Sequence, residues 1–435
     1  MRPIPASLLL IFGLACGAAS KEEGPDSGQR GPADAPAWTG AADAPDAATW
    51  PQYRREVQHL GQAHPDAVFD APDGLSAALT WRSDAFAIGD YSASKSSPTV
   101  AGDAVYIGVD DGTLRCLDRA TGALRWTFRT HRADVEDAQE SSDHHGVHGT
   151  AAVDDEGRVF IGDYSGWLYA IDAQDGSLIW EEDLGGSIGA SPVLHDGMVF
   201  IAVEFPDPDG KIFVVDAATG ALWYETPALG NHPHSSVSLD PARRIMTVGS
   251  NNGLLSAFDY EQRAPLWAAP MRADAEARDI KATAAMLDGL AYITSWDQHL
   301  HVIDVEDGSE RAQFPATNMS MSSPTLADGR VLFGAHDSLL YAVEGAADGD
   351  PQLVWSTDLV GALTSSPTVV PASGRVLIGE NGTTGDGAIV LIELESGDVL
   401  DKMTLGGRVS SVPVVVDGAL YVGDGEGRVW RFDAP

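Results

Sequence analysis

Cysteine is scarce in this chain: only two occur among 435 residues, at Cys16 and Cys116. The sequence has no adjacent cysteine pair and no Cys-x-x-Cys-His motif, which excludes a vicinal disulfide and a covalently attached c-type haem. It also has no Walker loop and no His-Glu-x-x-His motif. The sequence therefore carries no signature of a P-loop NTPase or a zinc peptidase.

Basic residues are also few, with 27 Lys and Arg against 64 Asp and Glu and a formal net charge of −37. Nucleic-acid phosphates are bound through basic patches, so this balance excludes non-specific nucleic-acid binding. It also argues against docking on anionic lipid through a broad basic face. The hydrophobic content of 44% is too high for a disordered acidic chain, so a folded core is expected.

The N-terminal apolar run, from about Ala6 to Ala15, is too short to span a bilayer and is typical of a signal peptide. It ends at Cys16 in a sequence that resembles a bacterial lipobox, although Gly13 stands where that pattern prefers Leu. The resemblance implies that residues 1–16 direct export, that Cys16 is lipidated, and that the chain reaches the outer membrane. A plain secretory signal cleaved nearby is the alternative. Residues 17–49, rich in Ala, Pro, Asp, Gly and Ser, are predicted to be a disordered tether.

Glycine and tryptophan, at 47 and 11 residues, are by contrast frequent and indicate β-structure with many tight turns. From Thr80 onward the chain repeats itself; an insertion stretches the second copy, and the later copies are spaced about forty to forty-seven residues apart. The clearest copy, residues 96–130, predicts strands at 98–100, 104–109, 113–118 and 123–128. Equivalent positions in the copies predict the turns between first and second strands: Gly102, Gly157, Gly197, Ala242, Gly289, Gly329, Gly374 and Gly418.

Eight copies are found when the first strands are counted, beginning near residues 96, 148, 190, 235, 282, 322, 365 and 411. The last copy ends after its third strand, and residues 77–82 resemble the missing fourth strand. Pairing of that N-terminal strand with the last copy would close a ring and remove an open sheet edge. The sequence therefore predicts an all-β fold over residues 77–435, an eight-bladed β-propeller of four-stranded blades closed by an N-terminal strand.

A recurring motif, Asp-x-x-Thr-Gly followed by Trp four residues later, spans the third and fourth strands of the copies. The Asp side chain can accept turn amides, and the Trp ring is expected to pack over the turn of a neighbouring blade. In the third copy Trp223 comes one place early, and the fifth copy has Ala312 instead of Trp. The tryptophans expected to join blades in this way are Trp81, Trp126, Trp180, Trp267 and Trp355.

This motif resembles the tryptophan-docking repeat of the quinoprotein (PQQ-repeat) superfamily, and the resemblance covers residues 77–435. Residues 50–76, which begin Trp50-Pro51-Gln52-Tyr53, resemble the segment that precedes secreted propellers of this type. The resemblance implies that they pack against the disc.

The superfamily contains two functional classes. Its dehydrogenases bind pyrroloquinoline quinone (PQQ), many of them with a vicinal disulfide, a Glu/Asn calcium pair and a catalytic Asp. Its scaffold class includes the propeller lipoprotein of the outer-membrane β-barrel assembly machinery, which has eight blades and no cofactor. The layout here matches the second class.

We therefore expect an exported, non-enzymatic, protein-binding scaffold without a catalytic residue or a cofactor. It would be a monomeric disc, anchored by lipid at the outer membrane and facing the periplasm or the cell surface. Its partners would be envelope proteins. The alternatives are a PQQ-dependent oxidoreductase and a metal-binding propeller.

Residues that interrupt the repeat are the candidates for specific binding. His144, His145 and His148 precede the second blade, and His232 and His234 precede the fourth. Loops before innermost strands share one face of a propeller, so these imidazoles could converge on Zn or Cu. The alternative is that they are hydrogen-bonding turn residues.

Two further pairs lie in equivalent loops. Lys95 and Lys281 precede the first and fifth blades and could bind an anionic ligand in the central funnel, or pair with local carboxylates. Met319 and Met321 precede the sixth blade and could contribute soft ligands to copper, or fill gaps in the core.

Overall fold

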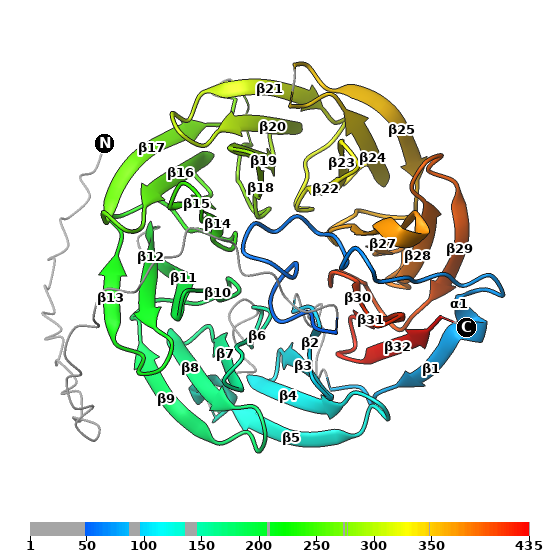
Figure 1. Cartoon of the computed structure of the whole chain (residues 1–435), viewed down its shortest axis with the longest axis horizontal. Helices are drawn as coiled ribbons and strands as arrows, with labels where there is room; N and C mark the ends of the chain where they lie inside the picture. The colour runs from blue at the N-terminus through cyan, green and yellow to red at the C-terminus, as the bar shows by residue number, and fades with distance from the viewer. Residues whose placement is uncertain are drawn as a thin grey trace, which may run out of the picture.

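Eight four-stranded antiparallel sheets surround a central axis in the computed structural model of the chain (Figure 1). The structure describes residues 48–86, 96–134, 146–206, 209–272, 275, 277–347 and 349–434. The predicted eight-bladed propeller is confirmed. Within the described residues, no helix has the length and apolar character needed to cross a membrane.

The first four blades each use four consecutive strands, ordered from the axis outward. Blade one is β2 (Thr99–Ala101), β3 (Ala104–Val109), β4 (Thr113–Asp118) and β5 (Leu124–Arg129). Blade two is β6 (Ala152–Val153), β7 (Arg158–Gly162), β8 (Trp167–Asp172) and β9 (Leu178–Asp183). Blade three is β10 (Val193–His195), β11 (Met198–Phe205), β12 (Asp209–Asp216) and β13 (Leu222–Glu225). Blade four is β14 (Ser238–Asp240), β15 (Ile245–Gly249), β16 (Leu254–Asp259) and β17 (Ala264–Pro270).

The same order continues around the ring to the C-terminus. Blade five is β18 (Ala285–Leu287), β19 (Leu290–Thr294), β20 (His299–Asp304) and β21 (Glu310–Pro315). Blade six is β22 (Thr325–Ala327), β23 (Arg330–Gly334), β24 (Leu339–Glu344) and β25 (Gln352–Asp358). Blade seven is β26 (Thr368–Val370), β27 (Arg375–Glu380), β28 (Ala388–Glu393) and β29 (Val399–Thr404). Short helical turns are α1 (Leu75–Ala78), η1 (His131–Asp134) and η3 (Pro371–Ser373).

Blade eight closes the ring with strands from both ends of the chain: β30 (Val414–Val416), β31 (Ala419–Gly423), β32 (Val429–Asp433) and β1 (Leu79–Arg82). In the pairing of β1 with β32, Trp81 lies opposite Arg431 and Arg82 lies opposite Trp430. The predicted N-terminal closing strand is therefore confirmed. It begins at Leu79, because the two preceding alanines belong to α1.

Neighbouring blades are joined at the rim by the five tryptophans that the repeat singled out. Each indole N–H donates to a backbone carbonyl in a turn of the following blade, at 2.9–3.1 Å: Trp81 to Arg119, Trp126 to Ala173, Trp180 to Ala217, Trp267 to Val305 and Trp355 to Leu394. Three residues after that carbonyl, each turn has a glycine with positive φ. A Cβ on Gly176, for example, would lie 2.7 Å from the Trp126 ring, so only glycine lets the indole pack on the turn.

The junction between blades three and four departs from this pattern. Trp223 comes early in its strand, and Arg263 occupies the turn position where the five junctions described above have glycine. Arg263 adopts a φ of 56° and places its guanidinium over the Trp223 ring, 5.1 Å from the ring centroid. A cation–π contact therefore replaces the glycine–indole contact at this junction.

A ring of hydroxyl groups joins the blades near the axis. Two residues before each innermost strand, a backbone N–H donates to the hydroxyl at the same position of the next blade. Seven such bonds measure 2.8–3.0 Å. Six link consecutive members of the series Ser97, Thr150, Ser191, Ser236, Thr283, Ser323 and Ser366, and in the seventh the Val412 amide donates to the Ser97 hydroxyl. Val412 of blade eight has no hydroxyl to accept from Ser366, so the ring is interrupted there.

Val412→Thr is expected to complete this ring, because threonine has nearly the shape of valine and adds a hydroxyl facing the Ser366 amide. The free energy of unfolding should rise by about 0.5–1.5 kcal/mol. Ser236→Ala removes an existing bond and should lower it by about 1–3 kcal/mol. Urea unfolding of both variants measures the effects, and a destabilised Val412→Thr variant would contradict the proposed acceptor position.

Residues 50–71 form a plug that circles the axis on the face of the turns between first and second strands (Figure 1). A backbone N–H in seven of the eight innermost strands donates to the plug at 2.7–3.1 Å. The donors, in blade order, are Val100, Val153, Leu194, Leu239, Met286, Leu326 and Val369. Six acceptors are backbone carbonyls of the plug, and the side-chain oxygen of Gln52 is the seventh. The plug therefore contacts every blade from one to seven in chain order.

Arg54 and His59 fix the plug at its centre, and both are fully buried. The Arg54 guanidinium donates to the carbonyls of His59, Ser323 and Pro324 and to the Thr325 hydroxyl, at 2.6–3.0 Å. Each His59 ring nitrogen lies within 2.9 Å of a backbone carbonyl, and burial lowers the pKa of His59 to about 4, so the neutral ring donates to only one of the two carbonyls. Neutral His59 therefore accompanies a charged, fully hydrogen-bonded Arg54.

Glu56 of the plug gives the fold a pH-dependent term. Burial raises the pKa of Glu56 to about 7 from an ordinary value of 4.5. Between these values the folded state binds more protons than the unfolded state, so stability falls as the pH rises from about 4.5 to about 7. Glu56→Gln keeps an acceptor for the Leu60 amide and removes the titration. Between pH 5 and pH 8, the wild type should lose about 2 kcal/mol more of its unfolding free energy than this variant.

Urea unfolding at the two pH values checks this expectation. His59 titrates in the opposite sense, but it is present in both proteins and cancels in the comparison. An identical pH dependence in the wild type and the Glu56→Gln variant would show that Glu56 is already ionised in the fold.

Candidate functional site

A cavity of about 330 Å³ lies on the propeller axis. Tyr53 of the plug lines it, and the Tyr53 hydroxyl lies 3.3 Å from that of Ser323. The hydroxyl ring forms much of the wall, and the loops that precede the innermost strands contribute His148, His234 and Arg408. The plug therefore bounds the cavity on one face, and the functional candidates from the sequence gather toward the other.

Two cations line this cavity in an otherwise acidic protein. Lys281 places its ammonium 4.3 Å from the centroid of the Trp296 ring, and the exposed Arg408 comes from the loop before blade eight. Together with the wall hydroxyls, they could hold an anionic group. Lys95, the predicted counterpart of Lys281, lies outside the described residues.

The two methionines of the loop before blade six occupy different places. Met321 lines the cavity, whereas the Met319 carbonyl accepts a hydrogen bond of 2.9 Å from the His336 amide.

Of the five histidines that were expected to converge, only His232 and His234 meet among the described residues. His144 and His145 lie outside the described residues. His148 lines the cavity, but its Nε2 lies 3.3 Å from Asp110 and its ring packs on Tyr164 at 4.4 Å between centroids. It is not among the described side chains that gather around one point with His232 and His234.

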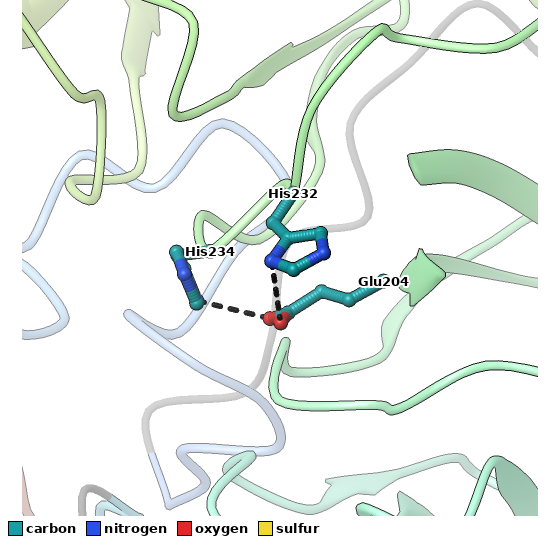
Figure 2. A group of neighbouring side chains, drawn as sticks. All are labelled: Glu204, His232 and His234. Atoms are coloured by element: carbon teal, nitrogen blue, oxygen red, sulfur yellow. Dashed lines mark ion pairs between the residues drawn. The ribbon is translucent and has the colours of Figure 1, made fainter. Parts of the chain in front are cut away.

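Those two histidines instead meet Glu204, a residue that sequence reasoning missed (Figure 2). Glu204 lies near the end of β11, and the histidines lie in the loop that leads into blade four. The nitrogen and oxygen ligand atoms of the three side chains all lie within 4.8 Å of one another. A signal for Glu204 was available in the length of β11 and β12. Each strand has eight residues, which extends blade three toward the histidine loop.

One hydrolase-like pattern, Gly185-x-Ser187-x-Gly189, occurs between β9 and β10. A nucleophile elbow needs a strand followed by a helix, whereas this segment connects two strands. The Ser187 carbonyl accepts the Glu204 amide at 2.9 Å. The segment is therefore a blade connection.

The donor set does not fit the calcium and PQQ site that the dehydrogenase resemblance implies. The buried carboxylate beside the cavity, Glu204, is faced by two imidazoles, whereas Ca²⁺ prefers oxygen ligands throughout. The aromatic side chains that line the described cavity are Tyr53 and Tyr164 together with the two histidines, and no tryptophan offers a flat surface for a quinone ring there.

Comparison with known proteins places the fold in a family. A family profile described as "Outer membrane protein assembly factor BamB" matches residues 67–140, 110–259, 251–352 and 346–435. The chain is 23% identical over 358 residues to outer membrane protein assembly factor BamB of Yersinia pestis, covering 79% of this chain and 86% of that protein.

Solved structures show the same fold. BamB from Moraxella catarrhalis gives a TM-score of 0.62 at 19% identity, covering 82% of this chain and 97% of that one. A europium-containing methanol dehydrogenase gives 0.69 at 14% identity, covering 87% and 90%. An assembly factor and a dehydrogenase therefore share this fold. Because the family profile matches overlapping stretches from residue 67 to residue 435, the chain belongs to the family of outer membrane protein assembly factor BamB.

Proposed function

We propose that this chain is a non-enzymatic scaffold for the assembly of outer-membrane proteins, exported and held at the membrane by lipid on Cys16. The family match over residues 67–435 carries the proposal. Relatives from several bacteria that share this family name match along most of their length. The partners would be envelope proteins of the assembly machinery, bound by a rigid disc that needs no cofactor.

The architecture supports a scaffold. Indole bonds join five pairs of neighbouring blades at the rim, bonds of the hydroxyl ring join seven pairs near the axis, and the plug ties seven blades to one segment. Such a disc presents its loops and outer strands with little conformational change, which lowers the entropic cost of binding a partner. The fold leaves exposed apolar side chains on the outermost strands: Leu124, Leu178, Ile179, Leu222, Leu266, Leu353, Val399 and Leu400. Apolar rim positions of this kind suit protein contacts.

Affinity capture of the full-length protein from the bacterium that encodes it tests the partners. After mild crosslinking of intact cells, a tagged chain should recover β-barrel assembly components. Recovery of redox enzymes in their place would favour the oxidoreductase alternative, and failure to recover any envelope protein would contradict the scaffold.

Cys16→Ser tests the anchor separately. The wild type should incorporate labelled fatty acid and fractionate with the outer membrane, whereas the variant should do neither and remain soluble after export. Unchanged fractionation of the variant would favour a cleaved secretory signal.

A further inference from the structure

Three potential metal ligands meet beside the cavity, where blades three and four adjoin (Figure 2). His234 Nδ1 lies 3.0 Å from Glu204 Oε1, and His232 Nδ1 lies 3.8 Å from Glu204 Oε2. The two imidazole rings stand at 89° to each other with their centroids 6.1 Å apart. Figure 2 shows His232 above and His234 to the left of the same carboxylate, with a dashed line from each to Glu204.

The hydrogen bonds around this group leave lone pairs facing one another. His232 Nε2 lies 2.9 Å from the Phe205 carbonyl, which can only accept, so Nε2 carries the proton. In the neutral ring, Nδ1 then directs a lone pair toward the Glu204 carboxylate. A metal-binding histidine has this arrangement, with its second nitrogen fixed by a backbone carbonyl.

Glu204 itself supplies an independent indication. Glu204 is 7% exposed, and its buried Oε1 accepts no hydrogen bond, although His234 Nδ1 lies 3.0 Å away. A buried carboxylate oxygen is costly to leave unpaired. A cation shared by Oε1 and the two Nδ1 atoms would satisfy this oxygen.

The backbone holds these ligands in place. The Leu229 amide donates to the Gly210 carbonyl, and the Gly230 amide donates to the Asp209 carboxylate, both at 2.9 Å. A Cβ on Gly210 would collide with the Pro233 ring, so the loop lies directly on β12. The histidine loop of blade four is thus fixed to the strand that pairs with the strand of Glu204.

We propose that Glu204, His232 and His234 bind a divalent transition-metal ion of the Zn²⁺ type. Two imidazoles and one carboxylate are a donor set that such ions favour, whereas Mg²⁺ and Ca²⁺ favour oxygen ligands alone. Tetrahedral Zn²⁺, with bonds of about 2.0–2.2 Å, separates its ligand atoms by about 3.3–3.6 Å. The three ligand atoms, one from each residue, lie within 4.8 Å of one another, so binding would draw them together by side-chain rotation. The remaining positions of the ion would face the cavity that His234 lines.

Zinc titration of the full-length protein tests the site. After removal of metal with a chelator, calorimetry should record one Zn²⁺ per chain. Glu204→Gln and the double variant His232→Ala/His234→Ala should each weaken binding at least tenfold. A matched control is His131→Gln, which breaks a rim ion pair of 3.1 Å between His131 and Glu181 and should bind zinc as the wild type does.

Cobalt provides a spectroscopic readout that a purely structural role would not alter. Co²⁺ added to the wild type should produce d–d absorption of a low-symmetry nitrogen and oxygen site, and this absorption should be lost in Glu204→Gln. Circular dichroism in chelator verifies that each variant is folded. Absence of stoichiometric zinc binding by the wild type, or equal affinity in wild type and Glu204→Gln, would overturn the site and leave a simple ion pair.

Discussion

Arg54→Met is expected to lower the free energy of unfolding by about 3–5 kcal/mol, because it leaves buried acceptors unsatisfied. The guanidinium is fully buried and donates to three carbonyls and one hydroxyl, which belong to the plug and to blade six. Methionine can fill the space of the aliphatic stem but offers no donor. The variant should also expose residues 50–71 to protease before the blades unfold.

Urea unfolding and limited proteolysis measure the two effects. Arg311→Met is the matched control, since Arg311 is about half exposed and forms a surface ion pair with Asp304. Its loss should cost no more than about 1 kcal/mol. If Arg54→Met is as mild as Arg311→Met, the plug is not anchored by this side chain.

Trp180→Ala is expected to lower the free energy of unfolding by about 3–5 kcal/mol through loss of a buried aromatic ring. Trp180 is 3% exposed, donates to the Ala217 carbonyl at 3.0 Å and packs on Gly220 of blade three. Trp180→Phe keeps most of the ring contact and removes the hydrogen bond, so it should cost about 1–2 kcal/mol.

The exceptional blade junction provides the control for this prediction. Trp223 is half buried, and its ring lies against Arg263 instead of a glycine turn. Trp223→Ala should therefore lower the free energy of unfolding by less than half as much as Trp180→Ala. Equal losses at the two positions would mean that the repeat tryptophans contribute only general burial.

The blades could be predicted because their sequence signals are local. Gly102 and Gly418 mark equivalent turns in the first and last blades, and each repeat Trp lies at a set distance from an Asp–Gly turn. The closing strand followed from the incomplete last copy. The resemblance of residues 50–76 implied packing on the disc, but their circular path could not be predicted. Its hydrogen bonds use mainly backbone carbonyls, which every residue has.

The candidate site was predicted only in part because its residues meet across blades. His232 and His234 stood out as rare residues in a loop, whereas Glu204 is one of 64 acidic residues with no distinguishing motif. The sequence grouped the histidines of blades two and four, which do not adjoin. The structure instead brings the blade-four loop onto the long strands of blade three, because Gly210 permits the contact.

The level of folded β-barrel proteins in the outer membrane tests the proposed scaffold most directly. Deletion of the gene in the bacterium that encodes this chain should lower that level, and both wild type and Glu204→Gln should restore it, since the metal site is a separate property. Normal amounts of folded β-barrel proteins after deletion would contradict the account.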